Sequence, residues 1–451
     1  MKKPSFFFKN QPPLQAEFGS VRLIASYVNK GFVVSRYRKL TRRQSFESIL
    51  LSGPSGSGKT SRFLLKQLYS LNGCSLLIND PQGELWLYGS GYLQKHYSEV
   101  YSINFSDSTK SAAYNPFSRI KKANDANKLA DLLVSTTLDK GNGDVFWKLA
   151  SVSLTTVLIR ILLHQPSEYH NLANLIHLLQ LFTIDSKKVD VLVAKTHDEN
   201  LINAYKETIS VPEKTLSNVI YSVKSALQCF DDPEIIKTTA FDTIDFERLR
   251  KVPTAIFLNN TIGDQRYISV LNSIFFEQFY AYALEKLPQK SDLPIYLILE
   301  ECGSSLYIPI LAQAVSTARK AKVGALITVQ SHSQLKSFYK ADAETIKSNC
   351  RSKIWLTGQT SLDELREVET LGGKRIYKDE KNIERTVPLI AADAIRMLPE
   401  NRSIILSGNH PLILAKSSPY YRSLWYGRYA KIPPMQLKQH IPDGPVPLIK
   451  L

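Results

Sequence analysis

A phosphate-binding loop is predicted near the start of the chain, between a short apolar run and an amphipathic stretch. The segment ILLSGPSGSGKTSRFLLKQL contains Gly53, four further residues, and then Gly58, Lys59 and Thr60. Glycines at these positions let successive backbone N–H groups converge on phosphate oxygens without a clash with a Cβ atom. We expect an exposed Lys59 to reach the β- and γ-phosphates of ATP, and the Thr60 hydroxyl to hold Mg²⁺. The residues predicted to contact the nucleotide are Gly53, Pro54, Ser55, Gly56, Ser57, Gly58, Lys59, Thr60 and Ser61.

Two carboxylates follow a second apolar run and are candidates for the metal and catalytic positions. Glu300 and Glu301 stand at the carboxyl end of the run IYLIL, which is typical of a buried strand. We expect Glu300 to hold Mg²⁺ together with Thr60, and Glu301 to polarise the attacking water. The metal position usually holds Asp, so the longer Glu300 is a departure. A solvated strand end is the alternative interpretation of this pair.

Two further polar residues belong to the next predicted helix and strand. Gln330 ends the apolar run ALITV, where it could sense the γ-phosphate, orient water or simply cap the strand. Arg319 stands eleven residues earlier. It is a candidate arginine finger for a neighbouring subunit, or a surface arginine beside Lys320 and Lys322. The predicted catalytic residues are therefore Lys59, Glu301, Gln330 and Arg319.

Short apolar runs that alternate with helical stretches predict an α/β fold around a mainly parallel sheet. The runs are 48–51, 74–78 and 100–103 in a first block, and 254–258, 295–299, 325–329, 353–356 and 404–406 in a second. Between the blocks, apolar residues recur at helical spacing and glycine is almost absent. This pattern indicates an all-α domain inserted into the α/β domain. Phe146 and Trp147 lie in an apolar stripe of the insert and are predicted to be core residues.

These boundaries predict five parts. They are an N-terminal segment (1–45), a first part of the nucleotide-binding domain (46–124), the inserted all-α domain (125–245), a second part of the nucleotide-binding domain (246–432) and an extended Pro-rich tail (433–451).

Charge and cysteine content limit the partners and the compartment. Lys and Arg number 57 against 41 acidic residues, a net charge of +16. Such an excess favours nucleic acid or an anionic membrane surface, with a basic solubilising surface as the alternative. The four cysteines form no CxxC pair, which argues against a zinc ribbon and a disulfide framework. No apolar run reaches the ~18 residues of a membrane span, and the start lacks the core of a signal peptide. We therefore expect a cytoplasmic protein.

The motifs and their order resemble the TraG/TraD family of coupling proteins of type IV secretion, motors related to the FtsK and HerA translocases. The resemblance extends from about residue 18 to 407. It rests on the P-loop, LLINDPQGEL (76–85), YNPF (114–117), FW (146–147), the stretch from LILEECGSS to SQLKSFY (297–339) and ETIKSNCRSKIWLTGQTSLDELREVETLGGKR (344–375). It implies a RecA-like P-loop NTPase fold of the FtsK/HerA type, and it strengthens the finger role of Arg319.

For function, the resemblance implies a homohexameric ring that hydrolyses ATP and moves DNA through a central channel. The DNA is expected to be single-stranded and to be bound without sequence preference. Relaxase or secretion-channel proteins would be its partners. Two departures are Glu300 and Gln82, which replaces the usual lysine of the turn after residue 80. A third is the lack of the family's pair of transmembrane helices, so membrane contact is expected only through a partner at the inner face. The alternatives are a HerA-like DNA translocase without a secretion role, and a nucleotide-switched cargo adaptor.

Overall fold

The computed structural model describes residues 15–138, 145–259, 265–304, 306–378, 380–438 and 440–450. The chain divides into two units, each assembled from separate stretches of sequence. Unit 1 comprises Met1–Asn72, Glu301–Ser304 and Gly324–Lys431, and unit 2 comprises Gly73–Glu300, Ser305–Val323 and Ile432–Leu451. The P-loop therefore belongs to unit 1, and the helical stretch between the two blocks of strands belongs to unit 2.

Unit 1 carries strands in the order β13-β12-β9-β3-β8. The strand before the P-loop, β3 (Ile49–Ser52), lies between β8 (Val323–Val329) and β9 (Ser352–Leu356) and is parallel to both. β12 (Arg402–Ser407) is antiparallel to β9 and to β13 (Ile413–Lys416). Every residue of β3 is buried, which explains why its sequence is a continuous apolar run rather than an alternating one.

Unit 2 carries strands in the order β7-β4-β6-β5, and all of these neighbours are parallel. Their bounds are β7 (Ile295–Leu299), β4 (Ser75–Asp80), β6 (Thr254–Asn259) and β5 (Glu99–Ile103). The mainly parallel strands with their helices confirm the predicted α/β class. Each predicted apolar run corresponds to a strand whose ends lie within two residues of the prediction.

Helices connect these strands in both units. Those of unit 1 are α1 (Arg42–Ser45), α2 (Leu65–Ser70), α13 (His332–Tyr339), α14 (Asp342–Asn349), α15 (Leu362–Gly372), α16 (Ala392–Arg396) and α17 (Leu424–Tyr429). Those that connect the strands of unit 2 are α3 (Glu84–His96), α11 (Gln265–Glu285) and α12 (Leu311–Thr317). In unit 1, α15 and α16 cover β9 and β12 through an apolar cluster that includes Trp355, Leu365, Val368, Ile395 and Ile404.

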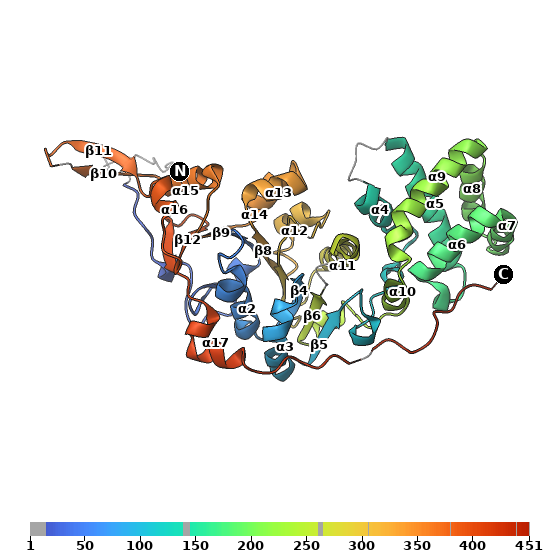
Figure 1. Ribbon diagram of the computed structural model, residues 1–451, viewed down its shortest axis with the longest axis horizontal. Coiled ribbons are helices and arrows are strands. Elements are labelled where there is room, and N and C mark those ends of the chain that lie inside the picture. The colour runs from blue at the N-terminus through green and yellow to red at the C-terminus, as the bar shows by residue number, and fades with distance from the viewer. Residues whose placement is uncertain are drawn as a thin grey trace, which may run out of the picture. The chain divides into compact units, whose positions relative to one another are not determined.

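The remaining helices of unit 2 form a bundle, drawn in green in Figure 1. They are α4 (Ala123–Leu138), α5 (Val145–Leu163), α6 (Leu172–Ile184), α7 (Ser186–Lys195), α8 (Glu199–Ile209), α9 (Glu213–Leu227) and α10 (Pro233–Ala240). Among the described residues, α5 alone is long and apolar enough to cross a membrane, so the prediction that no run reaches that length was wrong. Half of its most apolar window is buried, and it packs against α4, α6, α8 and α9. The prediction for Phe146 was also wrong, because its side chain is 53% exposed.

Two small hairpins were not predicted. They are β1 (Val33–Ser35) with β2 (Arg38–Lys39), and β10 (Lys374–Lys378) with β11 (Glu384–Pro388). β10 and β11 are largely exposed and rich in charged residues, so they lack the apolar pattern by which buried strands are found. The short 3₁₀ turns among the described residues are η1 (Val21–Leu23), η3 (Ser108–Lys110), η4 (Pro116–Arg119), η5 (Ser167–Tyr169), η6 (Gln228–Phe230), η7 (Arg248–Arg250) and η9 (Tyr420–Arg422).

The last stretch of the chain has neither helix nor strand in the part that the structure describes. Within unit 2 it passes α3 and β5 and ends at the helical bundle, as Figure 1 shows. We call its described residues from Ile432 to Lys450 the C-terminal strap.

Candidate nucleotide-binding site

The loop after β3 contains glycines with backbone conformations that other residues rarely adopt. Gly56 and Gly58 have φ angles of 77° and 83°. The Gly53 N–H donates to the Val329 carbonyl oxygen at 3.2 Å, and a Cβ atom at Gly53 would lie only 2.6 Å from Ser57 Oγ. Side chains at these positions would therefore strain or obstruct the loop. Their absence suits a backbone that must approach a phosphate group closely.

Lys59 is buried in the loop, contrary to the prediction that it is exposed. The residue is only 8% exposed. The ammonium Nζ donates to the carbonyl oxygens of Gly53 at 2.6 Å and Pro54 at 3.3 Å. A buried ammonium needs such acceptors because it has lost its water. Lys59 therefore holds the loop together in addition to pointing its charge at the loop interior.

The chain after Lys59 starts with one π-type turn, η2 (Thr60–Leu64), and only then becomes the α-helix α2. Thr60 and Ser61 are partly buried in this turn, and the Ser61 hydroxyl donates to the Gly58 carbonyl at 3.4 Å. The Arg62 guanidinium donates to both the backbone carbonyl and the carboxylate of Glu400. Turns of the π type are rare and occur often at functional sites, and this one fixes how the two hydroxyl groups leave the loop.

Glu301 and Gln330 lie near the carboxyl ends of β3 and β8, where the loop begins. The Glu301 N–H donates to Thr328 Oγ1 at 3.0 Å. Gln330 directly follows β8, whose Val329 pairs with Ser52, the last residue before the loop. Glu301 has a φ of 53°, in the left-handed region. A non-glycine residue there costs on the order of 1–3 kcal/mol, and such strain gathers at functional sites.

Glu300 and Arg319, the other two predicted site residues, belong to unit 2. Glu300 is buried, and its carbonyl oxygen accepts a hydrogen bond from Asn79 Nδ2 at 2.8 Å. Arg319 is exposed in the turn after α12. The structure thus brings the loop, Glu301 and Gln330 together within unit 1, while Glu300 and Arg319 are placed within unit 2.

The turn after β4 joins that strand to α3 through a buried carboxylate. Asp80 accepts hydrogen bonds from the backbone N–H groups of Leu85 at 3.2 Å and Trp86 at 2.6 Å. Burial raises the pKa of Asp80 to about 7, although these backbone donors act in the opposite direction. Gly83 caps the helix with a φ of 71°, a conformation that explains the glycine. Gln82, the departure from the resembled motif, is exposed.

A buried polar network beside the loop was missed in the sequence. The Ser52 hydroxyl donates to Glu364 Oε1 at 2.7 Å and accepts from Gln359 Nε2 at 3.1 Å. The His332 N–H donates to the same Glu364 oxygen at 3.2 Å. Glu364 is only 2% exposed. It therefore joins the end of β3, the start of α13 and the first turn of α15.

The network continues away from the loop through charged side chains. His332 Nδ1 lies 3.0 Å from Glu367 Oε2, and Lys347 Nζ lies 2.9 Å from the same oxygen. Burial acts to raise the pKa of Glu367, but the contacts with His332 and Lys347 hold it below its usual value. The sequence carried one signal of this network, because Glu364 lies next to Leu365 among the apolar positions of α15. Acidic side chains are rarely fully buried unless they have partners.

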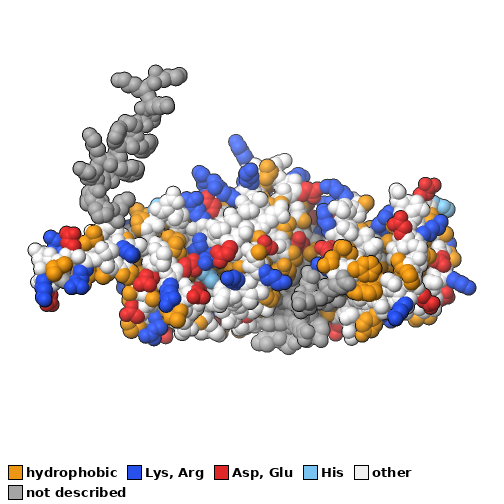
Figure 2. Space-filling model, turned by 90° about the horizontal axis from the view of Figure 1, so that it is seen from above, with side chains coloured by type: hydrophobic (Ala, Val, Ile, Leu, Met, Phe, Trp, Pro, Cys, Tyr) orange, Lys and Arg blue, Asp and Glu red, His pale blue; other side chains and the backbone are white. Residues whose placement is uncertain are grey.

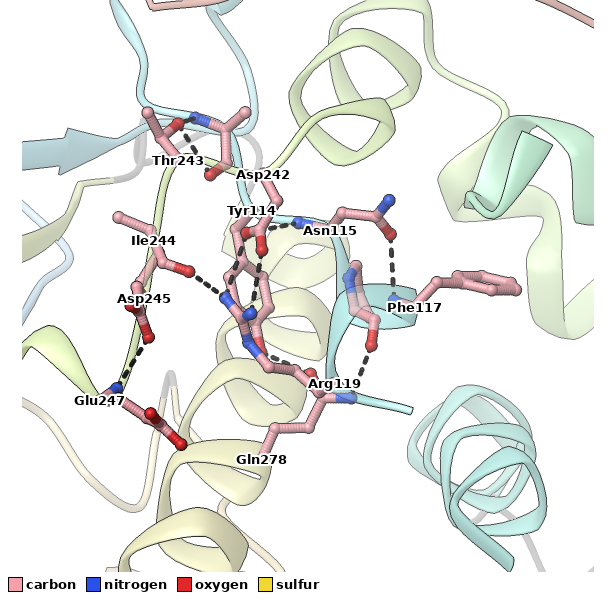
Figure 3. A network of polar contacts seen from close by, with 12 residues as sticks. Tyr114, Asn115, Phe117, Arg119, Asp242, Thr243, Ile244, Asp245, Glu247 and Gln278 are labelled. Carbon is pink, nitrogen blue, oxygen red and sulfur yellow. Dashed lines mark hydrogen bonds and ion pairs between the residues drawn. The ribbon is translucent and has the colours of Figure 1, made fainter. Parts of the chain in front are cut away.

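The YNPF motif lies where the α/β part of unit 2 meets its helical bundle (Figure 3). The Arg119 guanidinium donates to both carboxylate oxygens of Asp242, at 2.9 and 3.1 Å. It also lies 4.7 Å from the centre of the Phe246 ring. Asn115 Oδ1 accepts from the Phe117 N–H at 3.0 Å and starts the η4 turn. The motif therefore fastens the chain entering the bundle to the chain leaving it.

The positive charge is not gathered into one patch on the face shown in Figure 2. There, Lys and Arg side chains are interspersed with Asp and Glu among the described residues that this view shows. The net charge alone therefore marks no path for a nucleic acid on this face.

Comparison with known proteins shows a family that spans nearly the whole chain. The family described as "Type IV secretory system Conjugative DNA transfer" matches residues 23–443. The conjugal transfer protein TraG of Escherichia coli is 21% identical over 446 residues, which cover 86% of this chain and 69% of TraG.

Solved structures show the same fold. The bacterial conjugative coupling protein TrwBdeltaN70, in complex with sulphate, has a TM-score of 0.71 at 19% identity and covers 89% of this chain and 93% of its own. The plasmid coupling protein TrwB in complex with ADP and Mg²⁺ has a TM-score of 0.68 at 18% identity, covering 92% and 97%. VirB4 of Thermoanaerobacter pseudethanolicus has a TM-score of 0.55 at 14% identity, covering 90% and 99%.

Proposed function

Because the chain belongs to the type IV secretory system conjugative DNA transfer family, we propose that it is an ATP-driven motor that couples DNA to a secretion channel. The observation that carries the ATPase proposal is the loop around Lys59, with Glu301 and Gln330 beside it. TrwB, which shares the fold, has been solved with ADP and Mg²⁺ and with a non-hydrolysable ATP analogue. The glycine geometry of the loop fits the same kind of ligand.

We assign roles to the residues as follows. Lys59 exchanges its bonds to the Gly53 and Pro54 carbonyls for phosphate oxygens. Thr60 and Glu300 would hold Mg²⁺, which would neutralise the negative charge on the phosphate oxygens of ATP. Glu301 orients and polarises the attacking water, and Gln330 senses the γ-phosphate.

We assign the finger role to Arg319, which acts on the nucleotide of the next subunit in a ring of six. Its exposed position after α12 leaves the guanidinium at the surface, as contact with another subunit requires. Single-stranded DNA bound without sequence preference is the substrate, and relaxase or channel proteins are the partners. A membrane partner recruits the motor to the inner face of the membrane.

The test is ATP hydrolysis by the full chain over a range of protein concentrations, with single-stranded DNA, double-stranded DNA or neither. We expect turnover that rises steeply with protein concentration and is stimulated by DNA, because the finger must come from a second subunit. Lys59→Ala should abolish turnover. Since it also removes two internal hydrogen bonds, its thermal unfolding must be compared with that of the wild type.

One observation favours a second candidate, a nucleotide-switched cargo adaptor. Glu300 stands where Asp is usual, and its longer side chain changes the reach to the metal. ATP binding with negligible turnover at every concentration would support the adaptor and contradict the motor. In that case, Glu300→Asp is the substitution that should restore hydrolysis.

A further inference from the structure

The C-terminal strap is fastened to unit 2 along its length rather than lying loosely on the surface. The Met435 N–H donates to Ser90 Oγ at 3.0 Å. At Gly91, an added Cβ atom would lie 2.0 Å from the Pro433 carbonyl oxygen, so the strap approaches α3 at a point where only glycine fits. Further on, the His440 ring lies 5.6 Å from that of Tyr101 on β5.

At the helical bundle, one buried amide binds the backbone of the strap at two places. Asn174 Nδ2 donates to the Pro447 carbonyl at 2.9 Å, and Asn174 Oδ1 accepts from the Ile449 N–H at 2.9 Å. The amide cannot turn over, because Nδ2 also donates to Asn171 Oδ1 at 3.0 Å. Residues two apart on an extended chain present their backbone groups to the same side. Asn174 therefore recognises an extended backbone whatever side chains it carries.

One side chain supplies the apolar anchor. Ile449 is 6% exposed, whereas its neighbours Leu448 and Lys450 are exposed. Burial of an isoleucine side chain is favourable, so the contact at Ile449 is the main side-chain contribution to this end of the strap.

Beside the anchor the fit is incomplete. A cavity of about 190 Å³ is lined by Ala173, Ile176, His177 and Gln180 of α6, by Asp231 and Ile236, and by Val446 and Leu448 of the strap. The valine at position 446 leaves this space open. A larger apolar side chain at the same position of a bound peptide would fill it and gain the burial.

We propose that Asn174, the Ile449 pocket and this cavity form a peptide-binding site on the helical bundle. Its ligands are extended apolar peptides that contain proline, and residues 446–450 occupy it as an internal ligand. A tethered segment has an effective concentration of about millimolar, so an external peptide must fill the cavity better to displace the strap. This site is independent of the proposed ATPase activity.

The experiment uses full-length chains and a fluorescein-labelled peptide, IPDGPVPLIK, which repeats residues 441–450. Ile449→Asp should release the strap by placing a charge in the apolar pocket, and fluorescence polarisation should then show peptide binding. The wild type and Lys450→Asp, the same change at the exposed neighbour, should bind it at least about tenfold more weakly, because their own strap competes. A peptide with Phe in place of Val446 should bind Ile449→Asp several-fold more tightly.

Asn174→Leu added to Ile449→Asp should abolish binding, provided that its thermal unfolding shows a folded chain. Hydrogen exchange of the unmodified protein gives a second readout: the Ile449 amide should be protected, and Asn174→Leu alone should remove that protection. Absence of peptide binding to folded Ile449→Asp, or equal binding with and without Asn174, would overturn the proposal.

Discussion

At the scale of single residues, Glu301 combines backbone strain with its proposed catalytic role. Its φ of 53° places an L-residue in the left-handed region, and its N–H is held by Thr328 Oγ1. Strain at this position is the expected sign of a side chain kept in place for function at the expense of stability. Removal of the side chain should therefore separate activity from stability.

We predict that Glu301→Gly abolishes ATP turnover but raises the free energy of unfolding by about 1 kcal/mol, because glycine adopts this φ without strain. Glu301→Gln should also abolish turnover, yet leave stability within about 0.5 kcal/mol of the wild type, since the backbone strain remains. Urea denaturation measures the free energy of unfolding of both variants. If the glycine variant is no more stable than the glutamine variant, the strain at Glu301 is not significant.

Asp80 provides a prediction about pH. Its pKa is raised to about 7 in the folded chain, against roughly 3.9 in an unfolded one. Between these values the native state binds the extra proton, so this group's contribution to stability is complete below about pH 4 and is lost as pH rises to about 7. The slope is about 1.4 kcal/mol per pH unit.

Asp80→Asn removes this titration. The free energy of unfolding of the variant, relative to that of the wild type, should therefore be about 3 kcal/mol higher at pH 8 than at pH 5. Any constant cost of the lost acceptor for Leu85 or Trp86 cancels in this comparison. Urea denaturation at the two pH values gives the comparison. An unchanged difference between variant and wild type would show that the folded pKa of Asp80 is not raised.

At the scale of elements, Glu364 connects the strand before the P-loop with two helices. It accepts from the Ser52 hydroxyl and from the His332 N–H, and its removal would leave both donors buried without that acceptor. We predict that Glu364→Ala lowers the free energy of unfolding by about 2–4 kcal/mol and reduces turnover. Glu364→Gln keeps the accepting oxygen and should retain more of both.

Asp363→Ala is the matched control, because it removes a carboxylate from the same turn of α15 at an exposed position. Its effect should not exceed about 1 kcal/mol. Equal losses from Asp363→Ala and Glu364→Ala would mean that the helix terminus, rather than the contact with Ser52, accounts for the effect.

The elements differ in how far the sequence predicts them, and the reason is physical. A strand such as β7 is buried on both faces and is therefore a continuous apolar run with recognisable ends. The exposed hairpin of β10 and β11 carries no such pattern. A local sequence pattern also does not predict contacts between distant positions. Ser52 bonds to Glu364, 312 residues away in the sequence, and Asn174 bonds to Ile449, 275 residues away. The burial of Lys59 was missed because a motif gives the type of a residue but not its surroundings.

At the scale of the whole molecule, the proposed motor requires more than one copy of the chain. Arg319 is exposed in the turn after α12, and its proposed target is the nucleotide of another subunit. Glu301 acts in the proposal on the nucleotide of its own chain. A ring that mixes two inactive variants should therefore contain some complete sites.

We predict that Arg319→Ala and Glu301→Gln are each inactive alone and recover turnover when mixed. In an equal mixture, roughly a quarter of the interfaces pair an intact Glu301 with an intact Arg319. A mixture of Glu301→Gln with Lys59→Ala is the matched control, because both changes damage the same side of the interface and no pairing repairs them. Recovery in the first mixture and none in the second would establish an arginine finger acting between subunits. If both mixtures stay inactive while co-purification of differently tagged subunits shows mixed rings, Arg319 does not act across the interface.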